Sequence, residues 1–241
     1  MASQPATTPP GGGICVAVAV PDTAAAVRAV QPVLADVNVV EIRLDGMREA
    51  DIAGLCRQID RPLLFTNRAA WEGGACQVSE EERIAPLRTA VRCRAAFVDL
   101  ELRTEITLRQ RLLTEMQGSA TRLIISHHDF ARTPDAGQLS AILREQARSG
   151  AHIGKIVTMA HNHLDVLRVL NLQSEARERD FPLIAFCMGE AGRISRIITL
   201  LLGGFMTYAA LDARLATAPG QLSVGRLKAA MALLADSANR D

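Results

Sequence analysis

The chain has 241 residues, a formal net charge of +1, and only 3% aromatic residues. A near-neutral chain with no basic block and few rings for base stacking is not expected to bind nucleic acid or a membrane surface, whereas a small anion remains open as a ligand. Five cysteines, an odd number without a CxxC pair, predict reduced thiols in a cytoplasmic protein rather than a disulfide framework or a zinc site.

The chain begins with a segment rich in proline and glycine. We expect residues 1–13 to form a flexible N-terminal tail, because these residue types favour neither a helix nor a strand ladder. Residues 14–241 are expected to form a single catalytic domain. The tail lacks the positive region of a signal peptide, and no apolar run reaches the ~20 residues needed to cross a bilayer. The expected compartment is therefore the cytoplasm.

Short apolar or alternating runs recur along the rest of the chain. They predict eight strands, at 14–20, 39–45, 62–67, 95–102, 122–130, 152–160, 182–189 and 203–211. Segments with helical spacing lie between them, for example 79–93, 105–117, 136–148 and 164–179, with a last one at 221–239. Eight strand-then-helix units in a chain of this length predict a (β/α)8 TIM barrel. A doubly wound open sheet is the alternative, although no GxGxxG follows the first strand.

Polar residues alternate with apolar ones toward the C-terminal ends of several predicted strands. A period of two places the charges of Glu41, Arg43 and Asp45 on one face of the second strand. The same alternation occurs at 66–68, 99–101 and 126–128. A solvent-facing antiparallel sheet gives this pattern too. In a barrel, however, these side chains point into the lumen at the mouth where such enzymes keep their active sites.

Lys155 lies inside the apolar run 152–160, where no neighbour in the sequence neutralises it. It is one of two lysines, the other being Lys228, among 27 lysine and arginine residues. An amine can lose its proton and attack a carbonyl, which a guanidinium effectively cannot. The position therefore points to covalent chemistry through an imine. A strand-end lysine that reaches solvent or pairs with a carboxylate is the alternative.

Short motifs occur in the following order along the chain: Glu-Ile-Arg-Leu-Asp (41–45), Phe-Thr-Asn-Arg (65–68) with Glu-Gly-Gly (72–74), Val-Asp-Leu-Glu-Leu (98–102), Ile-Ser-His-His-Asp-Phe (125–130) with Thr-Pro (133–134), Lys155, Met-Gly (188–189) with Ile-Ser-Arg (194–196), and Ala-Pro-Gly-Gln (218–221). Together they resemble the type I 3-dehydroquinate dehydratases, the Schiff-base class of (β/α)8 barrels. The resemblance spans about residues 14–225. Any one motif is weak, but the whole set in register is specific.

The resemblance implies a lyase that removes water from 3-dehydroquinate to give 3-dehydroshikimate, with no metal and no dissociable cofactor. Lys155 would form the imine with the substrate ketone. His128, the histidine before Asp-Phe, would take a proton from the adjacent carbon and later protonate the departing hydroxyl. Glu72 of the Glu-Gly-Gly turn would orient His128. The neighbouring His127 is expected to pack behind the sheet.

The resemblance also implies a set of substrate-binding residues: Glu41, Arg43, Arg68, Arg196, Thr217 and Gln221. Arg196 would clamp the substrate carboxylate, because a planar fork suits a carboxylate better than an ammonium does. Gln221 would cap the substrate from a closing loop after the eighth strand. Asp99 is expected to be a buried support rather than a catalyst.

Some positions depart from the family's usual pattern. Thr217 stands where a serine is common, Asn67 where an aromatic or aliphatic residue is usual, and 202–204 reads Leu-Gly-Gly in place of Phe-Gly-Ser. These changes put in question the fit of the closing loop and of the outer face of the third strand. His161 and His163 imitate a metal-binding pair, but no third ligand is in view and no metal site is expected.

Two other functions fit parts of the pattern. A class I aldolase also uses a barrel lysine and an imine, but it cleaves a carbon–carbon bond. A non-catalytic barrel would merely bind a small carboxylate through Arg196 and Arg43. The resemblance favours the dehydratase and suggests a homodimer. It does not separate the shikimate pathway of aromatic amino-acid biosynthesis from quinate breakdown, because both use the same reaction.

Overall fold

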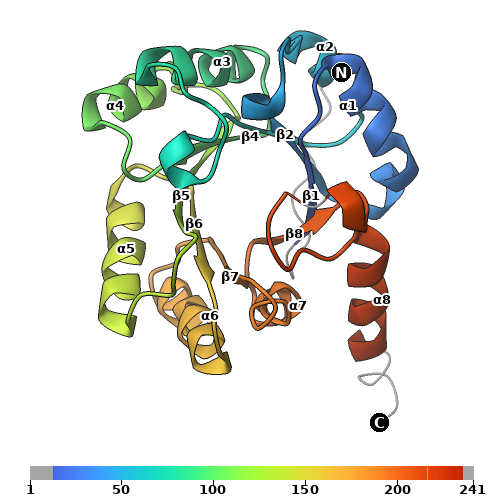
Figure 1. Cartoon of the computed structure of the whole chain (residues 1–241). Helices are drawn as coiled ribbons and strands as arrows, with labels where there is room; N and C mark the ends of the chain where they lie inside the picture. The colour runs from blue at the N-terminus through green and yellow to red at the C-terminus, as the bar shows by residue number, and fades with distance from the viewer. Residues whose placement is uncertain (1–12, 216, 236–241) are drawn as a thin grey trace.

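The computed structural model of the chain describes residues 13–215 and 217–235. Eight parallel strands lie in a ring, and the helices that connect them pack around it (Figure 1). The strands are β1 (Gly13–Val18), β2 (Val39–Arg43), β3 (Leu63–Thr66), β4 (Phe97–Glu101), β5 (Arg122–Asp129), β6 (Ile153–Met159), β7 (Leu183–Met188) and β8 (Met206–Ala210). The main helices are α1 (Thr23–Val30), α2 (Ile52–Gln58), α3 (Glu80–Arg92), α4 (Ile106–Glu115), α5 (Ala136–Arg148), α6 (His163–Glu178), α7 (Ser195–Leu201) and α8 (Val224–Ala235).

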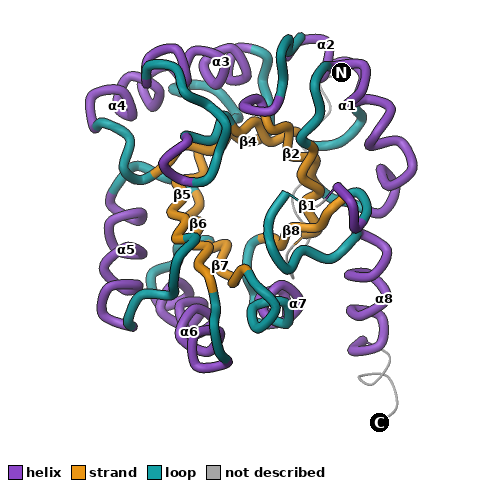
Figure 2. The backbone as a smooth tube through the Cα atoms, viewed as in Figure 1, coloured by secondary structure: helices purple, strands orange, loops and turns teal. Residues whose placement is uncertain are grey.

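The sheet closes on itself. Its strand order is β7-β6-β5-β4-β3-β2-β1-β8, so that β1 pairs in parallel with both β2 and β8. At the remaining junction the Phe205 amide, just before β8, donates to the carbonyl of Leu183 in β7 (2.8 Å). Figure 2 shows the resulting ring of strands inside the ring of helices. The predicted (β/α)8 barrel is confirmed, and the doubly wound alternative is wrong.

Some element boundaries differ from those expected. β1 begins at Gly13, the last residue of the expected tail; the rest of that tail, 1–12, lies outside the described residues. β2 ends at Arg43, because Leu44–Gly46 turns into a 3-10 helix closed by a hydrogen bond from the Met47 amide to the Leu44 carbonyl (3.0 Å). α8 begins at Val224 rather than at 221, which leaves Gln221 in the preceding loop.

Helix starts follow the local sequence. Ser79 caps α3 in a reciprocal capping box with Glu82, and Asp135 caps α5 in the same way with Gln138. Each cap satisfies amide groups that the first turn leaves unpaired. These two caps begin α3 and α5 at positions that the sequence marks.

Two apolar layers hold the barrel. The outward-facing strand residues pack against the helices, whereas a separate cluster that includes Val39, Ile124 and Tyr208 fills the interior. In β2, the alternation that sends Val39 inward also sends Glu41 and Arg43 inward, further along the strand. The lower barrel is therefore a packed core, and its C-terminal mouth is polar.

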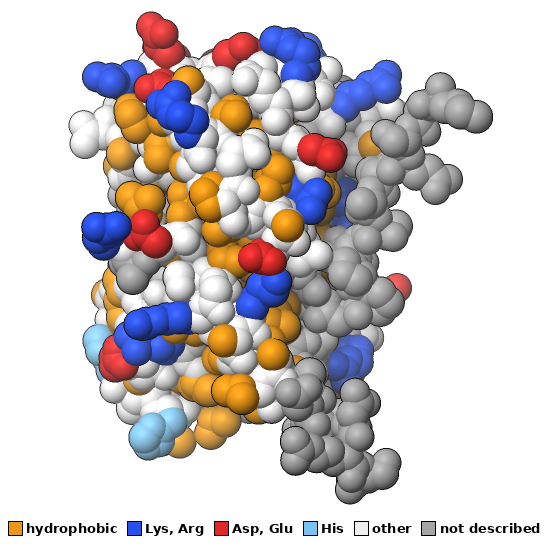
Figure 3. Space-filling view, turned by 90° about the vertical axis from the view of Figure 1, so that its right-hand side faces the viewer, with side chains coloured by type: hydrophobic (Ala, Val, Ile, Leu, Met, Phe, Trp, Pro, Cys, Tyr) orange, Lys and Arg blue, Asp and Glu red, His pale blue; other side chains and the backbone are white. Residues whose placement is uncertain are grey.

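The surface near α1 and α8 carries basic and acidic side chains scattered among apolar ones, with neither sign gathered into one field (Figure 3). Among the described residues, no helix is both long and apolar enough to cross a membrane.

Candidate active site

A pocket of about 60 Å³ opens at the C-terminal ends of the strands. All of the site residues that the sequence predicted line it, namely Glu41, Arg43, Arg68, Glu72, His128, Lys155, Arg196, Thr217 and Gln221. They come from most of the β-to-α units and meet because the carboxyl ends of parallel strands share one rim. The same pocket is lined by Gly73, Phe130, Val157, Phe186, Met188, Tyr208 and Ala218, to which the sequence assigned no role in the site.

Lys155 rises from β6 into this pocket and is only 4% exposed. Its Nζ donates to Asp99 Oδ2 and to Tyr208 Oη, both at 3.0 Å. Glu41 Oε1 lies 3.6 Å from the same nitrogen. The lysine therefore does not reach solvent. Lys155 pairs with carboxylates, as the alternative interpretation predicted, and it also lines the pocket, where it could react with a substrate.

Asp99, on β4, accepts hydrogen bonds from three side chains of the site. Its Oδ1 accepts from the Arg68 guanidinium (2.9 Å) and the Ser126 hydroxyl (2.6 Å), while Oδ2 accepts from Lys155. Burial raises the pKa of Asp99, but the positive charges of Arg68 and Lys155 and these hydrogen bonds outweigh it and hold the pKa at about 2. Asp99 is thus a buried carboxylate anchor, as expected.

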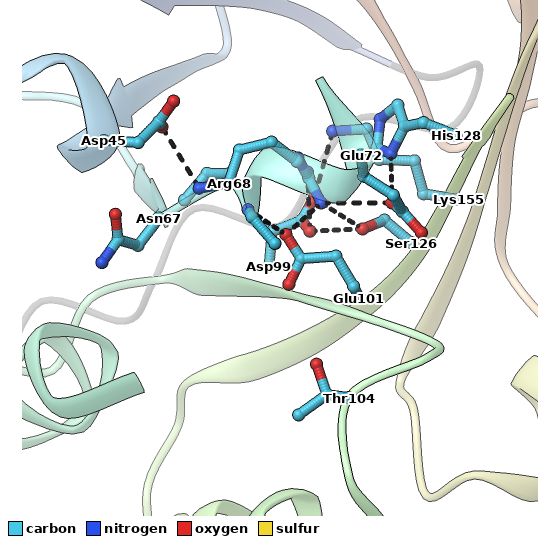
Figure 4. A network of polar contacts seen from close by, with 12 residues as sticks. Asp45, Asn67, Arg68, Glu72, Asp99, Glu101, Thr104, Ser126, His128 and Lys155 are labelled. Atoms are coloured by element: carbon cyan, nitrogen blue, oxygen red, sulfur yellow. Dashed lines mark hydrogen bonds and ion pairs between the residues drawn. The ribbon is translucent and has the colours of Figure 1, made fainter. Parts of the chain in front are cut away.

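Arg68 follows β3 and joins the strands that form this side of the mouth. Its Nη1 donates to Glu101 Oε1 (2.9 Å) and Ser126 Oγ (2.7 Å), and its Nη2 donates to Asp99. Figure 4 shows the guanidinium among these acceptors, and Glu72 Oε2 lies 3.7 Å from the same Nη1. Because these contacts occupy both terminal nitrogens, Arg68 acts first as a hub of the polar network.

Glu72 and His128 form a close pair at the mouth. Glu72 Oε2 lies 2.8 Å from His128 Nδ1. The 3-10 turn Ala70–Glu72 ends at Gly73, whose φ of +76° is left-handed and whose added Cβ would lie 2.4 Å from the Phe130 ring. Only glycine fits this turn, and the turn sets the position of Glu72.

Burial resists charge on this pair. It raises the pKa of Glu72 to about 8, against the attraction of Arg68, and it lowers the pKa of His128 well below its ordinary value, with Arg68 and Lys155 adding to the effect. Both directions favour a neutral imidazole. A neutral imidazole can accept a proton, and Glu72 in its ionised form, 2.8 Å away, stabilises the imidazolium that forms.

Arg196 is a buried cation without an anionic partner among the described residues. It is 1% exposed, its Nη2 donates to the Pro219 carbonyl (3.3 Å), and its guanidinium lies over the Phe186 ring (4.6 Å). Burial lowers the pKa of Arg196 to about 10. Buried charges are normally paired. Its Nε has no hydrogen-bond partner in the described structure, and neither does Glu72 Oε1, so the pocket offers unsatisfied polar atoms of both kinds.

The residues at the rim of the pocket form hydrogen bonds with their near neighbours in the sequence. Arg43 donates to Asp45 through Nε (2.9 Å) and Nη2 (2.7 Å). Asp45 lies beyond the end of β2 and also accepts from the Arg68 and Ala75 amides (3.2 and 3.1 Å). In the loop after β8, Gln221 Oε1 accepts from the amide (2.8 Å) and hydroxyl (3.2 Å) of Thr217. The threonine hydroxyl thus makes a contact that a serine at this position would also offer.

Two residues that take part in the polar network of the site were not identified from the sequence. Tyr208 is the single tyrosine of the chain and has an inward position on β8, a signal that could have drawn attention to it. Arg83 is 1% exposed on α3 and donates to Glu101 Oε2 (2.5 Å), with nothing in the sequence to indicate this. Arg83 also explains why an asparagine fits at position 67. The Asn67 side chain donates to the Arg83 carbonyl (2.8 Å), and the Arg83 side chain donates to the Asn67 carbonyl (3.1 Å).

The altered segment before β8 fits its surroundings. A Cβ at Gly204 would lie 2.6 Å from the Thr199 hydroxyl and 2.7 Å from the Thr199 carbonyl. Glycine therefore replaces the family's usual serine at a point where Thr199 leaves no room for a side chain.

The other histidines lie apart from the pocket lining. His127 faces away from it, as expected. His161 Nε2 is 2.7 Å from the Ala131 carbonyl, and His163 is the first residue of α6. Within 13–215 and 217–235, no cluster of three or more histidine, cysteine, aspartate or glutamate side chains suited to a metal is found.

Comparisons with known proteins agree on one family. The sequence model described as Type I 3-dehydroquinase matches residues 14–238. A 3-dehydroquinate dehydratase of Desulfotalea psychrophila is 41% identical over 191 residues, covering 79% of this chain and 84% of the relative. The crystal structure of the Geobacillus kaustophilus 3-dehydroquinate dehydratase matches with a TM-score of 0.85 at 28% identity, covering 95% of this chain and 92% of that one. A Clostridium difficile type I 3-dehydroquinate dehydratase, described with covalent modified comenic acid, matches with a TM-score of 0.81 at 25% identity, covering 95% and 94%.

Proposed function

The chain belongs to the type I 3-dehydroquinase family and dehydrates 3-dehydroquinate, and we propose that it does so through an imine between Lys155 and the substrate ketone. One observation carries the proposal: the Lys155 amine is buried in a pocket that it shares with the His128–Glu72 pair. An iminium draws electrons from the adjacent carbon and so acidifies its C–H bond. The covalent modification described for the Clostridium difficile relative, of a small carboxylic acid, supports covalent chemistry in this family.

In the proposed sequence His128 acts twice. It first accepts the proton of the carbon next to the iminium, and the released electron pair forms an enamine. The enamine then expels the hydroxyl, which takes the proton from the imidazolium and leaves as water. Hydrolysis of the remaining iminium releases 3-dehydroshikimate and returns the Lys155 amine. Burial keeps the imidazole neutral before the first transfer, and Glu72 holds its orientation.

Substrate binding uses the charges at the rim. We propose that Arg196 binds the substrate carboxylate, which would supply the anionic partner that this buried guanidinium lacks. Glu41, Arg43 and Arg68 bind ring hydroxyls. Thr217 and Gln221, which line the pocket from the loop after β8, cap the bound substrate.

The test combines turnover with trapping. The protein is incubated with 3-dehydroquinate while the conjugated enone is followed by ultraviolet absorbance, and a second sample is reduced with borohydride. We expect enone formation, a mass increase equal to the reduced substrate, and a modified peptide that contains Lys155. Turnover without an adduct, or an adduct on another residue, would refute the imine assignment.

The two alternative functions predict different results. A class I aldolase would cleave a sugar phosphate and form no enone. A carboxylate-binding barrel would gain thermal stability from the ligand but give no adduct. The comparisons favour the dehydratase over both.

We further propose a cytoplasmic homodimer that serves aromatic amino-acid biosynthesis in the shikimate pathway. The five cysteines are all free, which fits a reducing compartment. Leu164 and Leu167 on α6 are 66% and 54% exposed, and Leu201 on the adjacent α7 is 58% exposed, so apolar surface is available for a partner copy. Sedimentation equilibrium tests the dimer, and growth of a dehydratase-deficient strain without aromatic amino acids tests the pathway.

A further inference from the structure

We propose that Tyr208 relays a proton from Lys155 to the ketone oxygen while the carbon–nitrogen bond forms, an inference that rests on the proposed imine. The Tyr208 hydroxyl lies 3.0 Å from Lys155 Nζ. The same nitrogen lies 4.2 Å from the centre of the Tyr208 ring. The phenol therefore contacts the nucleophile both through its oxygen and through its aromatic face.

Tyr208 is held firmly in this place. It lies on β8, is 4% exposed, and its ring packs against that of Phe186 at 5.8 Å between centroids. Lys155 comes from β6, and its other close contact, Asp99, comes from β4. The amine thus lies between side chains of different strands, and the phenol forms one of the two hydrogen bonds that it makes within the described residues.

The phenol has a proton to give and no protein acceptor for it. Burial raises the pKa of Tyr208 well above its ordinary value, and the negative charge of Glu41 raises it further, so the side chain stays a neutral phenol. Its oxygen accepts from Lys155, and the described residues offer the hydroxyl no other hydrogen bond. Tyr208 lines the pocket, where the oxygen of a bound ketone can accept that proton.

The step balances without a net change in the phenol. Attack by the free amine forms the Nζ–carbon bond and opens the C=O double bond, which leaves a positive nitrogen and an alkoxide. One proton passes from Nζ to Tyr208 Oη while the Oη proton passes to the alkoxide oxygen. The products are a neutral carbinolamine and an unchanged Tyr208. Asp99 is unsuited to this relay, because a carboxyl with a pKa of about 2 carries no proton to deliver.

The experiment measures imine formation by itself. His128→Ala is expected to form the imine and stall, so this variant is mixed with saturating 3-dehydroquinate, reduced with borohydride at successive times, and weighed intact. Y208F, which keeps the ring but loses the hydroxyl, is then added to the His128→Ala background. We expect adduct formation to slow by about tenfold or more, as befits loss of a positioned proton-transfer group.

Thr207→Val supplies the matched control. Thr207 precedes Tyr208 on β8, is fully buried, and its hydroxyl has no hydrogen-bond partner among the described residues. Removing that hydroxyl in the His128→Ala background should leave the rate of adduct formation within about twofold, since Thr207 lies outside the pocket lining and takes no part in proton transfer.

The outcomes are distinguishable. Equal rates of adduct formation with and without the Tyr208 hydroxyl would overturn the relay and leave the imine intact. A change confined to thermal stability or to the substrate concentration at half-saturation would assign Tyr208 a structural role and likewise overturn the relay. Absence of any adduct in His128→Ala alone would overturn the proposed imine, and the relay with it.

Discussion

Replacement of Arg196 by methionine should make the protein more stable and less active. Burial lowers the pKa of Arg196 to about 10, well below its ordinary value, and no carboxylate among the described residues pairs with the guanidinium. At about 1.4 kcal/mol per pKa unit, keeping this buried side chain charged lowers the free energy of unfolding by roughly 3 kcal/mol. Since both pKa values lie above neutrality, the cost is present in full at pH 7.

Methionine fills much of the same space against Phe186 and carries no charge. Loss of the cation–π contact and of the hydrogen bond to the Pro219 carbonyl offsets about 1 kcal/mol of the gain. The expected net effect is a rise of about 2 kcal/mol in the free energy of unfolding, or roughly 4–8 °C in Tm for a chain of this size. The value of kcat/KM should fall by about a hundredfold or more, because the substrate carboxylate loses a charged, bidentate partner.

Calorimetry and steady-state absorbance measure the two effects, and 3-dehydroshikimate should raise the Tm of the unmodified protein but not that of Arg196→Met. Arg43→Met is the matched control. Arg43 already pairs with Asp45 at 2.7 Å, so its loss should lower stability. If Arg196→Met melts at a lower temperature than the unmodified protein and keeps its kcat/KM, the reasoning about an unpaired guanidinium is wrong.

Three further changes follow from the same contacts. Lys155→Ala should abolish turnover and the borohydride adduct while circular dichroism stays unchanged, because Asp99 keeps Arg68 and Ser126; measurable turnover in this variant would contradict the imine. In the folded protein the pKa of Glu72 is raised from 4.5 to about 8, so its contribution to stability is complete below pH 4.5 and is lost as the pH rises through about 8; Tm measured from pH 5 to 9 should therefore fall more for the unmodified protein than for Glu72→Gln, and parallel curves would argue against a buried neutral Glu72. The depressed pKa of Asp99 has the opposite sign: its contribution is present above pH 3.8 and is lost as the pH falls through about 2. Asp99→Asn should lower the free energy of unfolding in urea at pH 7 by about 3–5 kcal/mol, and an unchanged midpoint would show that the buried pair is not coupled to folding.

Much of the site could be predicted from local sequence because a strand alternates its side chains between two faces. Glu41 and Arg43, two residues apart, face the same pocket, and His128 faces it while His127 does not. The eight strand-then-helix units likewise predicted the barrel, because few other architectures bury so many parallel strands. Strand alternation predicted which face these residues occupy, and the resemblance to the family then implied their roles.

The partners of these residues were decided only by the tertiary structure. Lys155 meets Asp99 and Tyr208 across sequence separations of 56 and 53 positions, and closure of the ring brings them together. Arg83 reaches Glu101 from a helix, where no strand period applies. That no described carboxylate pairs with Arg196 is also a property of the assembled pocket. A sequence determines which face a side chain occupies, whereas pairing, burial and the pKa values that follow from them depend on which strands become neighbours.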